Sequence, residues 1–473
     1  MAPSAEAAPI NGAESPSVLS QDEAEAAISR FQQFLRFETV SALAEETGAY
    51  KACAEFLVQE LNALSILSDV HCLEGAPDHS PVVVAHWKGR DESLPVLLLN
   101  SHYDVVPAAA EDWSVAPFDA VRKDGNIYGR GTQDMKCVCM QYVEALRIIR
   151  QTKPDWKPAR TIYFTFVPDE EVGGGGMACF LESKLYKETI LQKHGGIALA
   201  LDEGLASETG AFSVFYGERL PWWIDIKATG PTGHGSRFIE NTAVEQLIEL
   251  SNKALAFRKG QKEQLGMAEH ENCTHAVVAK RKTLGDVTSL NITSLKAGVY
   301  AGSHLAYNCV PPVAECTLDI RISPHVQPSE IGNMLDVWCQ ECSKDPKSGS
   351  QITWQYSSKD GGNRMQQHAT TSMDANVNPW YMVFAETLEK DLGIPLVPQV
   401  FPAATDSRFL RALGIRALGF SPMRNTEIKL HEIDEYIEES NFLEGIAVYV
   451  KLVETLGSQG KHIDEKTKNN VIC

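Results

Sequence analysis

The sequence predicts an α/β domain with a mostly parallel sheet, into which a two-layer α+β domain is inserted. Apolar, strand-like runs alternate with helical stretches over the first two hundred residues, and this alternation favours a parallel sheet covered by helices. From about residue 218 the runs instead alternate apolar and polar positions, as half-buried strands do. The first pattern returns near residue 358, so the middle segment is predicted to be an insertion.

The first ordered element is expected near Ser20. Ser20 and Glu23 form a capping-box pattern ahead of apolar residues at helical spacing, which predicts a helix start. A second helix is expected over residues 50–64, and another over residues 135–150. The apolar runs predict four strands of the first domain, at residues 82–87, 96–100, 162–167 and 197–201.

The inserted segment is expected to hold three strands and two amphipathic helices on one face of them. The strands are predicted at residues 222–228, 289–295 and 315–322, and the helices at 241–257 and 329–341. Residues 260–286 are polar and predict a long loop. After the insertion we expect a helix at 379–391, a strand at 417–420 and a helix at 436–456. The predicted division is a disordered acidic tail (1–19), an α/β domain in two parts (20–217 and 358–457), the inserted domain (218–357) and a polar tail (458–473).

Bulk properties exclude several classes of protein. With 473 residues, two domains are the default expectation. The net charge of -19 argues against a nucleic-acid partner, because phosphate binding needs clustered Lys and Arg. No apolar run approaches the ~20 residues that span a bilayer, so no membrane association is expected. The N-terminus lacks a secretory signal pattern, and the eleven cysteines lack disulfide spacing, which together predict a cytoplasmic protein with reduced thiols.

Five short segments carry side chains that can bind metal, and three of them directly follow apolar strand-like runs. The carboxyl ends of strands in an α/β sheet share one crevice, so these residues are expected to converge there. Imidazoles and carboxylates together suit zinc, and adjacent carboxylates suit a pair of metals with a general base. The segments are residues 101–104, 131–136, 168–174, 202–204 and 429–432.

His102 and Asp104 form the first candidate pair. A lone histidine is more often structural than a ligand. Here the aspartate two residues later points to the same side of an extended chain, where it could hold the second ring nitrogen. Asp134 begins a helical stretch, so it could be a simple N-cap, or its two oxygens could bridge two metals.

Glu170 and Glu171 follow a strand-like run and precede four glycines. A solvated turn would explain the pair. The alternative gives the neighbours separate tasks, one as a metal ligand and one as the acceptor of a proton from water. Taken alone, Glu203 would usually be a loop residue and His431 a structural histidine. Taken together, the residues supply two histidines and enough acids for a two-metal site.

These segments resemble the M20 metallopeptidase family and, within it, the aminoacylases. The resemblance covers roughly residues 22–456, and its motifs occur in the family's order. Beyond the metal-binding segments, it is carried by Gly233-His234-Gly235-Ser236-Arg237-Phe238, Ala306-Tyr307-Asn308-Cys309-Val310-Pro311, Pro402-Ala403-Ala404-Thr405-Asp406-Ser407-Arg408-Phe409 and Leu418-Gly419-Phe420-Ser421-Pro422-Met423.

The resemblance implies a zinc-hydrolase catalytic domain with two Zn2+ per subunit. Asp104 would orient His102, and Glu170 would be the general base. The implied ligands are His102, Asp134 and Glu203 for one ion, and Asp134, Glu171 and His431 for the other.

The inserted domain would be a lid that also mediates homodimerisation. It carries His234, which in this family reaches the partner's active site and stabilises the tetrahedral intermediate, and Asn308 would assist from the lid. Arg408 would hold the substrate carboxylate with its planar fork. The implied reaction is hydrolysis of small-molecule N-acyl-L-amino acids, such as N-acetylated aliphatic ones, to a carboxylate and a free L-amino acid.

Two alternatives stay open on the sequence. A dipeptidase or carboxypeptidase of the same family would share the metal site and differ only in substrate. A non-catalytic binding protein on the same fold should have lost a ligand or the base, and none is missing here. Departures from the aminoacylase pattern, such as Tyr103 in place of a common threonine and the four glycines after Val172, could alter substrate fit.

Overall fold

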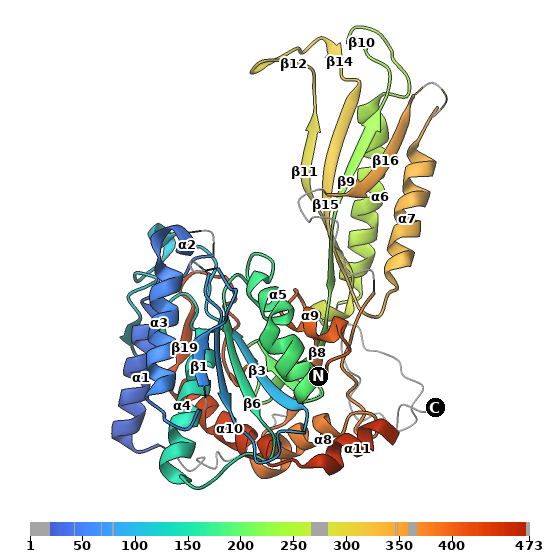
Figure 1. Ribbon diagram of the computed structural model, residues 1–473. Coiled ribbons are helices and arrows are strands. Elements are labelled where there is room, and N and C mark those ends of the chain that lie inside the picture. The colour runs from blue at the N-terminus through green and yellow to red at the C-terminus, as the bar shows by residue number, and fades with distance from the viewer. Residues whose placement is uncertain are drawn as a thin grey trace, which may run out of the picture.

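In the computed structural model, the chain forms two parts, each with its own sheet and hydrophobic core (Figure 1). The structure describes residues 19–265, 282–357 and 367–469, apart from residues 42, 68, 78, 79, 346 and 348. Of the predicted tail at residues 1–19, only Leu19 is described, and it is buried. The domain boundaries predicted from the sequence stay predictions.

The N-terminal helices begin where the sequence predicts. Helix α1 (Gln21–Leu35) follows Ser20, whose hydroxyl accepts a hydrogen bond from the backbone of Glu23, while the Glu23 carboxylate accepts one from the Ser20 backbone. This reciprocal capping box satisfies two backbone donors that the helix itself leaves open. Helices α2 (Ala44–Thr47) and α3 (Ala49–Asn62) follow.

The larger part is built on an eight-stranded mixed sheet whose centre is parallel. The pairs β6–β3, β3–β7 and β7–β18 run parallel, whereas β1 and β2 add antiparallel strands at one edge. The α/β fold class with a mostly parallel sheet is therefore confirmed. In spatial order the strands are β1 (Asp69–Cys72), β2 (Val83–Trp87), β6 (Ile162–Val167), β3 (Val96–His102), β7 (Ile197–Asp202), β18 (Ala417–Gly419), β8 (Phe212–Glu218) and β17 (Leu396–Phe401).

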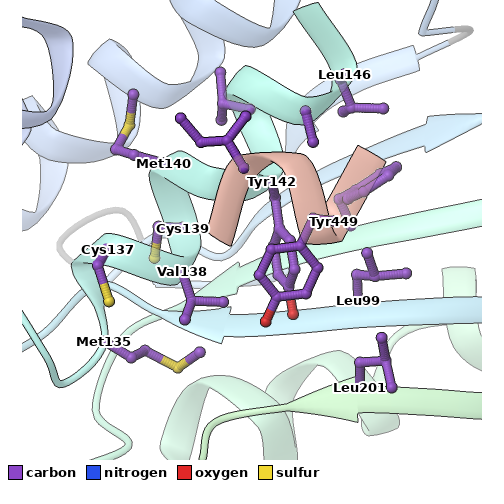
Figure 2. Packing of buried hydrophobic residues seen from close by; sticks show 14 of the residues in the cluster. Leu99, Met135, Cys137, Val138, Cys139, Met140, Tyr142, Leu146, Leu201 and Tyr449 are labelled. Atoms are coloured by element: carbon purple, nitrogen blue, oxygen red, sulfur yellow. The ribbon is translucent and has the colours of Figure 1, made fainter. Parts of the chain in front are cut away.

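Helices cover both faces of this sheet, because its strands are apolar on both sides. One face packs against α1, α3, α4 (Lys136–Thr152), α8 (Pro379–Glu386) and α10 (Glu439–Gly457), and the other against α5 (Gly175–Glu182) and α9 (Ser407–Ala412). Figure 2 shows Val138 and Tyr142 of α4 beside Leu99 and Leu201 of the sheet, with Tyr449 of α10 alongside. This packing fixes α4, and with it the loop that precedes α4, against the centre of the sheet.

The smaller part is an antiparallel four-stranded sheet with two helices on one face, α6 (Ala243–Glu263) and α7 (Pro328–Cys342) (Figure 1). Residues of β15 alternate between buried and partly exposed, as a sheet covered on one side requires. The order of the strands is β11 (Ser289–Ala297), β15 (Val313–Ile322), β9 (Leu220–Thr229) and β16 (Gln351–Tyr356). Short strands form the far tip, namely β10 (Gly233–His234), β12 (Tyr300–Ala301), β13 (His304–Leu305) and β14 (Cys309–Val310).

Several segments differ from what the sequence pattern predicts. The smaller sheet has a fourth strand, β16, where three were expected, and the large sheet includes β8 and β17, which were not predicted. The helix expected at residues 436–456 begins only at Glu439, because residues 436–438 form β19 (Tyr436–Glu438) against β5 (Asn126–Tyr128). The polar tail expected after residue 457 contains helix α11 (Lys461–Asn469), with Ile463 buried. Of the loop expected at 260–286, the start belongs to α6, and residues 266–281 lie outside the described residues.

The C-terminal helix is held by a buried cation. The guanidinium of Arg160, which is fully buried, donates hydrogen bonds to the backbone carbonyls of Gln459 and Gly460 and to the carboxylate of Asp464. Such long-range contacts leave no local signature in the polar sequence.

A bilayer-spanning helix would need a long apolar stretch, and no helix among the described residues has one.

Candidate metal centre

Candidate metal-binding side chains lie at the carboxyl ends of three adjacent strands, in the sheet order β6–β3–β7. His102 is the last residue of β3, Glu170 and Glu171 follow β6, and Glu203 follows β7. Asp134 lies just before α4. It is not the N-cap, since Met135 holds that position. Parallel strands thus deliver residues from distant segments to one crevice.

Asp134 lies between two imidazoles, and each imidazole also contacts a second carboxylate. Its Oδ1 lies 3.0 Å from Nε2 of His102, and its Oδ2 lies 3.2 Å from Nε2 of His431. His102 Nε2 also lies 2.8 Å from Glu203 Oε2, and His431 Nε2 lies 3.1 Å from Glu171 Oε2. The Asp134–Met135 peptide bond is cis. The structure therefore brings these five side chains into two groups that share one aspartate.

Asp104 holds two neighbouring segments together. Its carboxylate accepts hydrogen bonds from the backbone N–H groups of Glu170 and Glu171, each at 3.2 Å, and from the hydroxyl of Ser41 at 2.8 Å. His102 Nδ1 lies 3.0 Å from the backbone oxygen of Asp104 and 3.4 Å from its Oδ1. A contact at Nδ1 leaves Nε2 as the ring nitrogen that faces the centre.

The turn that carries Glu170 and Glu171 is tight. Asp169 adopts a left-handed backbone (φ 64°), and its carboxylate accepts a hydrogen bond from Tyr50 at 2.9 Å. Gly174 also has a positive φ of 78°, and a Cβ at this position would lie 2.3 Å from the ring of Phe409. Glycine is therefore required here both by conformation and by space.

The electrostatics of the cluster favour bound cations. Burial and the nearby charge of Glu203 raise the pKa of Glu170 well above its ordinary value, while burial and Asp134 raise the pKa of Glu171 to about 6. Burial lowers the pKa of His431, but hydrogen bonds to Asp134 and Glu171 outweigh it and raise that pKa to about 10. The carboxylates repel one another, so positive charge between them would stabilise the ionised cluster.

The donor atoms suit divalent metal ions. Among the described residues, the buried Oε1 atoms of Glu170 and Glu171 have no hydrogen-bond partner, which is costly unless a cation or water completes them. Donor atoms of His102, Asp134 and Glu171 lie within 4.8 Å of one another, and so do those of His102, Glu170 and Glu203. These two groups have His102 in common, and Asp134 is the carboxylate whose two oxygens each face an imidazole.

Arg408 reaches the same crevice from α9. Its Nη1 lies 3.6 Å from Oε1 of Glu170 and donates a hydrogen bond to the backbone oxygen of Thr405 at 2.9 Å. The guanidinium also lies over the ring of Phe409, 4.5 Å from its centre. A fixed cation beside Glu170 is suited to hold an anionic group of a substrate.

His234 and Asn308 do not join this cluster. His234 is on β10 and Asn308 directly precedes its neighbour β14, at the tip of the smaller part farthest from the large sheet (Figure 1). The N–H of Gly235 donates to the backbone oxygen of Asn308 at 2.7 Å, and His234 Nδ1 lies 2.8 Å from the Ser236 hydroxyl. Both side chains are exposed.

Residues 98–455 match the profile of Peptidase family M20/M25/M40. The chain belongs to this family. An aminoacylase-1 from Dictyostelium discoideum is 42% identical over 432 residues, covering 91% of this chain and 97% of the relative. Human carnosine dipeptidase 1 shares the fold with a TM-score of 0.64 at 14% identity, over 92% of this chain and 96% of that one. A Bacillus subtilis protein described as a dinuclear metal binding peptidase from the M20 family matches with a TM-score of 0.58 at 14% identity, over 92% and 100%.

The M20 centre has a buried polar support that the sequence analysis missed. Asp202, next to Glu203, accepts hydrogen bonds from the Asn100 amide at 2.9 Å and from the Ser407 hydroxyl at 2.7 Å. The Asn100 side-chain oxygen in turn accepts one from Thr165 at 2.6 Å. Asn100 directly precedes the segment at residues 101–104, and Asp202 and Ser407 lie within recognised motifs, so their positions gave a signal. Their hydrogen-bond partners, however, lie on other strands or on α9.

Proposed function

We propose that this M20 enzyme hydrolyses N-acyl-L-amino acids with short acyl groups, such as acetyl, to a carboxylate and a free L-amino acid. The observation that carries the proposal is the position of Asp134 between His102 and His431, with Glu170 in the same crevice. Such a centre suits metal-assisted amide hydrolysis. The similarity to aminoacylase-1 over nearly the whole chain supports the choice of substrate.

The proposed cofactor is two Zn2+ per subunit. His102, Asp134 and Glu203 would hold one ion, and Asp134, Glu171 and His431 the other. Mixed imidazole and carboxylate donors suit zinc, and the dinuclear centre described for the Bacillus subtilis relative supports the number. When bound, the ions would polarise the scissile carbonyl and lower the pKa of the attacking water.

Glu170 is the proposed general base and acid. It takes a proton from the water whose oxygen bonds to the acyl carbon, and it returns that proton to the nitrogen as the amide C–N bond breaks. Its backbone N–H is bound by Asp104, so the base is held by the same residue that contacts His102.

Arg408 would bind the substrate carboxylate beside this base. His234 and Asn308 lie far from the centre of their own chain, so we propose that they complete the centre of a second copy in a homodimer, where His234 stabilises the tetrahedral intermediate. The inserted domain then acts as lid and dimerisation domain.

A cytoplasmic location is proposed as well, in keeping with the nine described cysteines, all of which are free thiols.

The test is release of free amino acid from N-acetyl-L-methionine and from a panel of dipeptides, using zinc-loaded enzyme with a chelator control. Chelator-sensitive release from the acetylated substrate, with dipeptides poor, is the expected result. Preference for dipeptides would agree with the proposed metal centre but contradict the proposed substrate, and it would favour the dipeptidase or carboxypeptidase alternative. Metal binding without any turnover would favour the non-catalytic binding protein.

A further inference from the structure

Two loops far apart in sequence meet beside the proposed metal pair. The loop at residues 130–134 ends in Asp134, and the segment at residues 427–436 carries His431. These two ligands face each other at 3.2 Å, so small movements of either loop would change their separation. The contacts between the loops therefore decide how well the ligands are placed.

Glu435 is a buried carboxylate at the junction of these loops. Its exposed fraction is 0%. Its Oε2 accepts hydrogen bonds from the Arg130 guanidinium at 2.7 Å and from the Gly131 N–H at 3.1 Å. Its Oε1 accepts one from the Gln133 N–H at 2.7 Å, with the Asp134 N–H and the Thr132 hydroxyl at 3.4 Å. Five consecutive residues thus donate to one carboxylate.

Gln133 makes the reciprocal contacts. Its amide nitrogen donates hydrogen bonds to the backbone oxygens of Glu427 at 2.9 Å and Tyr436 at 2.8 Å, and its amide oxygen accepts one from the Lys429 N–H at 3.0 Å. The side chain therefore ties the loop of Asp134 to points on both sides of His431. The residue next to Asp134 holds the segment of His431, while Glu435 in that segment holds the loop of Asp134.

The contacts between Glu435 and the loop at residues 130–134 require a carboxylate. Every group that faces Glu435 in these contacts is a donor, and an ionised carboxylate only accepts. An amide in its place would direct an NH2 group at N–H donors and leave Arg130 without its counter-charge. No metal ligation is left for Glu435, because both of its oxygens are taken up by the neighbouring loop.

We propose that Glu435, with Gln133, is a positioning residue of the metal centre that holds Asp134 and His431 at the separation one shared ion requires. The inference rests on the metal set proposed above. Groups that orient metal ligands commonly change metal affinity about 10- to 100-fold when they are replaced. The effect of Glu435 should therefore appear in metal binding itself and not only in turnover.

The experiment measures Co2+ binding to the full-length apoprotein by equilibrium dialysis and by the visible spectrum of the bound ion. The variants are Glu435→Gln and Gln133→Ala, with His431→Ala as the reference for loss of one ligand. Glu144→Gln is the matched control, because Glu144 is also buried and paired with an arginine, Arg30 at 2.6 Å, but contacts neither loop. Circular dichroism reports whether each variant is folded.

The expected result is two ions per subunit for the wild type and for Glu144→Gln, with one ion bound about 10- to 100-fold more weakly in Glu435→Gln and Gln133→Ala. Gln133→Ala removes three hydrogen bonds and no buried charge, so it decides the question if Glu435→Gln does not fold. Wild-type affinity and spectrum in a folded Glu435→Gln or Gln133→Ala variant would overturn this inference and leave the proposed function standing. A wild type that binds no metal would overturn the proposed function, and this inference with it.

Discussion

The crevice at the large sheet and the tip of the inserted part carry the two halves of the candidate site, and they are built in opposite ways. In the crevice, His102 is 1% exposed and His431 is 45% exposed, and the loops that carry Glu170 and Asp134 are each held by hydrogen bonds to a carboxylate of another segment. At the tip, Tyr307 is 93% exposed, and its neighbour Asn308 and nearby His234 are exposed as well. The crevice is organised by contacts within its own chain, whereas the side chains of His234 and Asn308 at the tip are exposed.

This difference separates two kinds of effect. A change in the crevice removes a group whose surroundings are fixed, so it should alter chemistry or metal binding directly. A change at the tip touches few contacts within the chain, so stability should hardly respond. Any loss of activity there must then come from an interaction that the isolated chain does not make.

The largest expected effect is that of Glu170→Gln in the crevice. We expect kcat to fall about 10²- to 10⁴-fold, because the amide cannot take the proton from water. The metal content should match that of the wild type, since Glu170 is not a proposed ligand. Steady-state kinetics and metal analysis of the same preparation check this, and a variant that keeps its turnover would show that another group is the base.

His234→Ala at the tip should lower kcat about 10²- to 10³-fold, as loss of a group that stabilises an oxyanion does. Metal content and melting temperature should stay unchanged, because the side chain is exposed. Mixing this variant with Glu170→Gln and allowing subunits to exchange should restore activity, since half of the centres in mixed dimers would be intact. No recovery after proven exchange would contradict a contribution from the partner.

Arg408→Lys should mainly raise KM, by about 10- to 100-fold, because a lysine cannot reproduce two parallel hydrogen bonds to a carboxylate. The change in kcat should be smaller. The α-carboxamide analogue of the substrate provides the control: with N-acetyl-L-methionine amide, wild type and variant should differ little. Equal KM values for the acid would mean that the carboxylate is bound elsewhere.

The smallest expected effect on activity is that of Leu318→Ala, in the buried core of the inserted sheet. The inserted part should lose about 2–5 kcal/mol of stability, as is usual when a buried leucine is replaced by alanine. At temperatures where the variant is folded, metal affinity should be unchanged, because the two cores are separate. Leu199→Ala, in the large core, is the matched comparison and should lower the stability of the metal-binding part instead. Calorimetry with and without metal distinguishes them.

Much of the fold could be predicted from the sequence because its signals are local. The apolar run at residues 162–167 is β6 without any shift of boundary, and the capping box at Ser20 starts α1. Strand β19 could not be predicted, because three residues carry too little pattern and its partner β5 lies about three hundred residues earlier. Helix α11 was missed for the same reason, since its contact with Arg160 is distant in sequence.

The sequence by itself determined which residue types are available for the chemistry and, through the ends of apolar strands, that His102, Glu171 and Glu203 would share one edge of a sheet. Only the tertiary structure decided that Asp134 lies between two imidazoles, that Glu435 and Gln133 hold its loop against that of His431, and that His234 lies far from both. Hydrogen bonds between distant loops depend on where whole elements pack. No local pattern encodes that arrangement, because packing of the buried core first brings the loops together and the hydrogen bonds between them form only there.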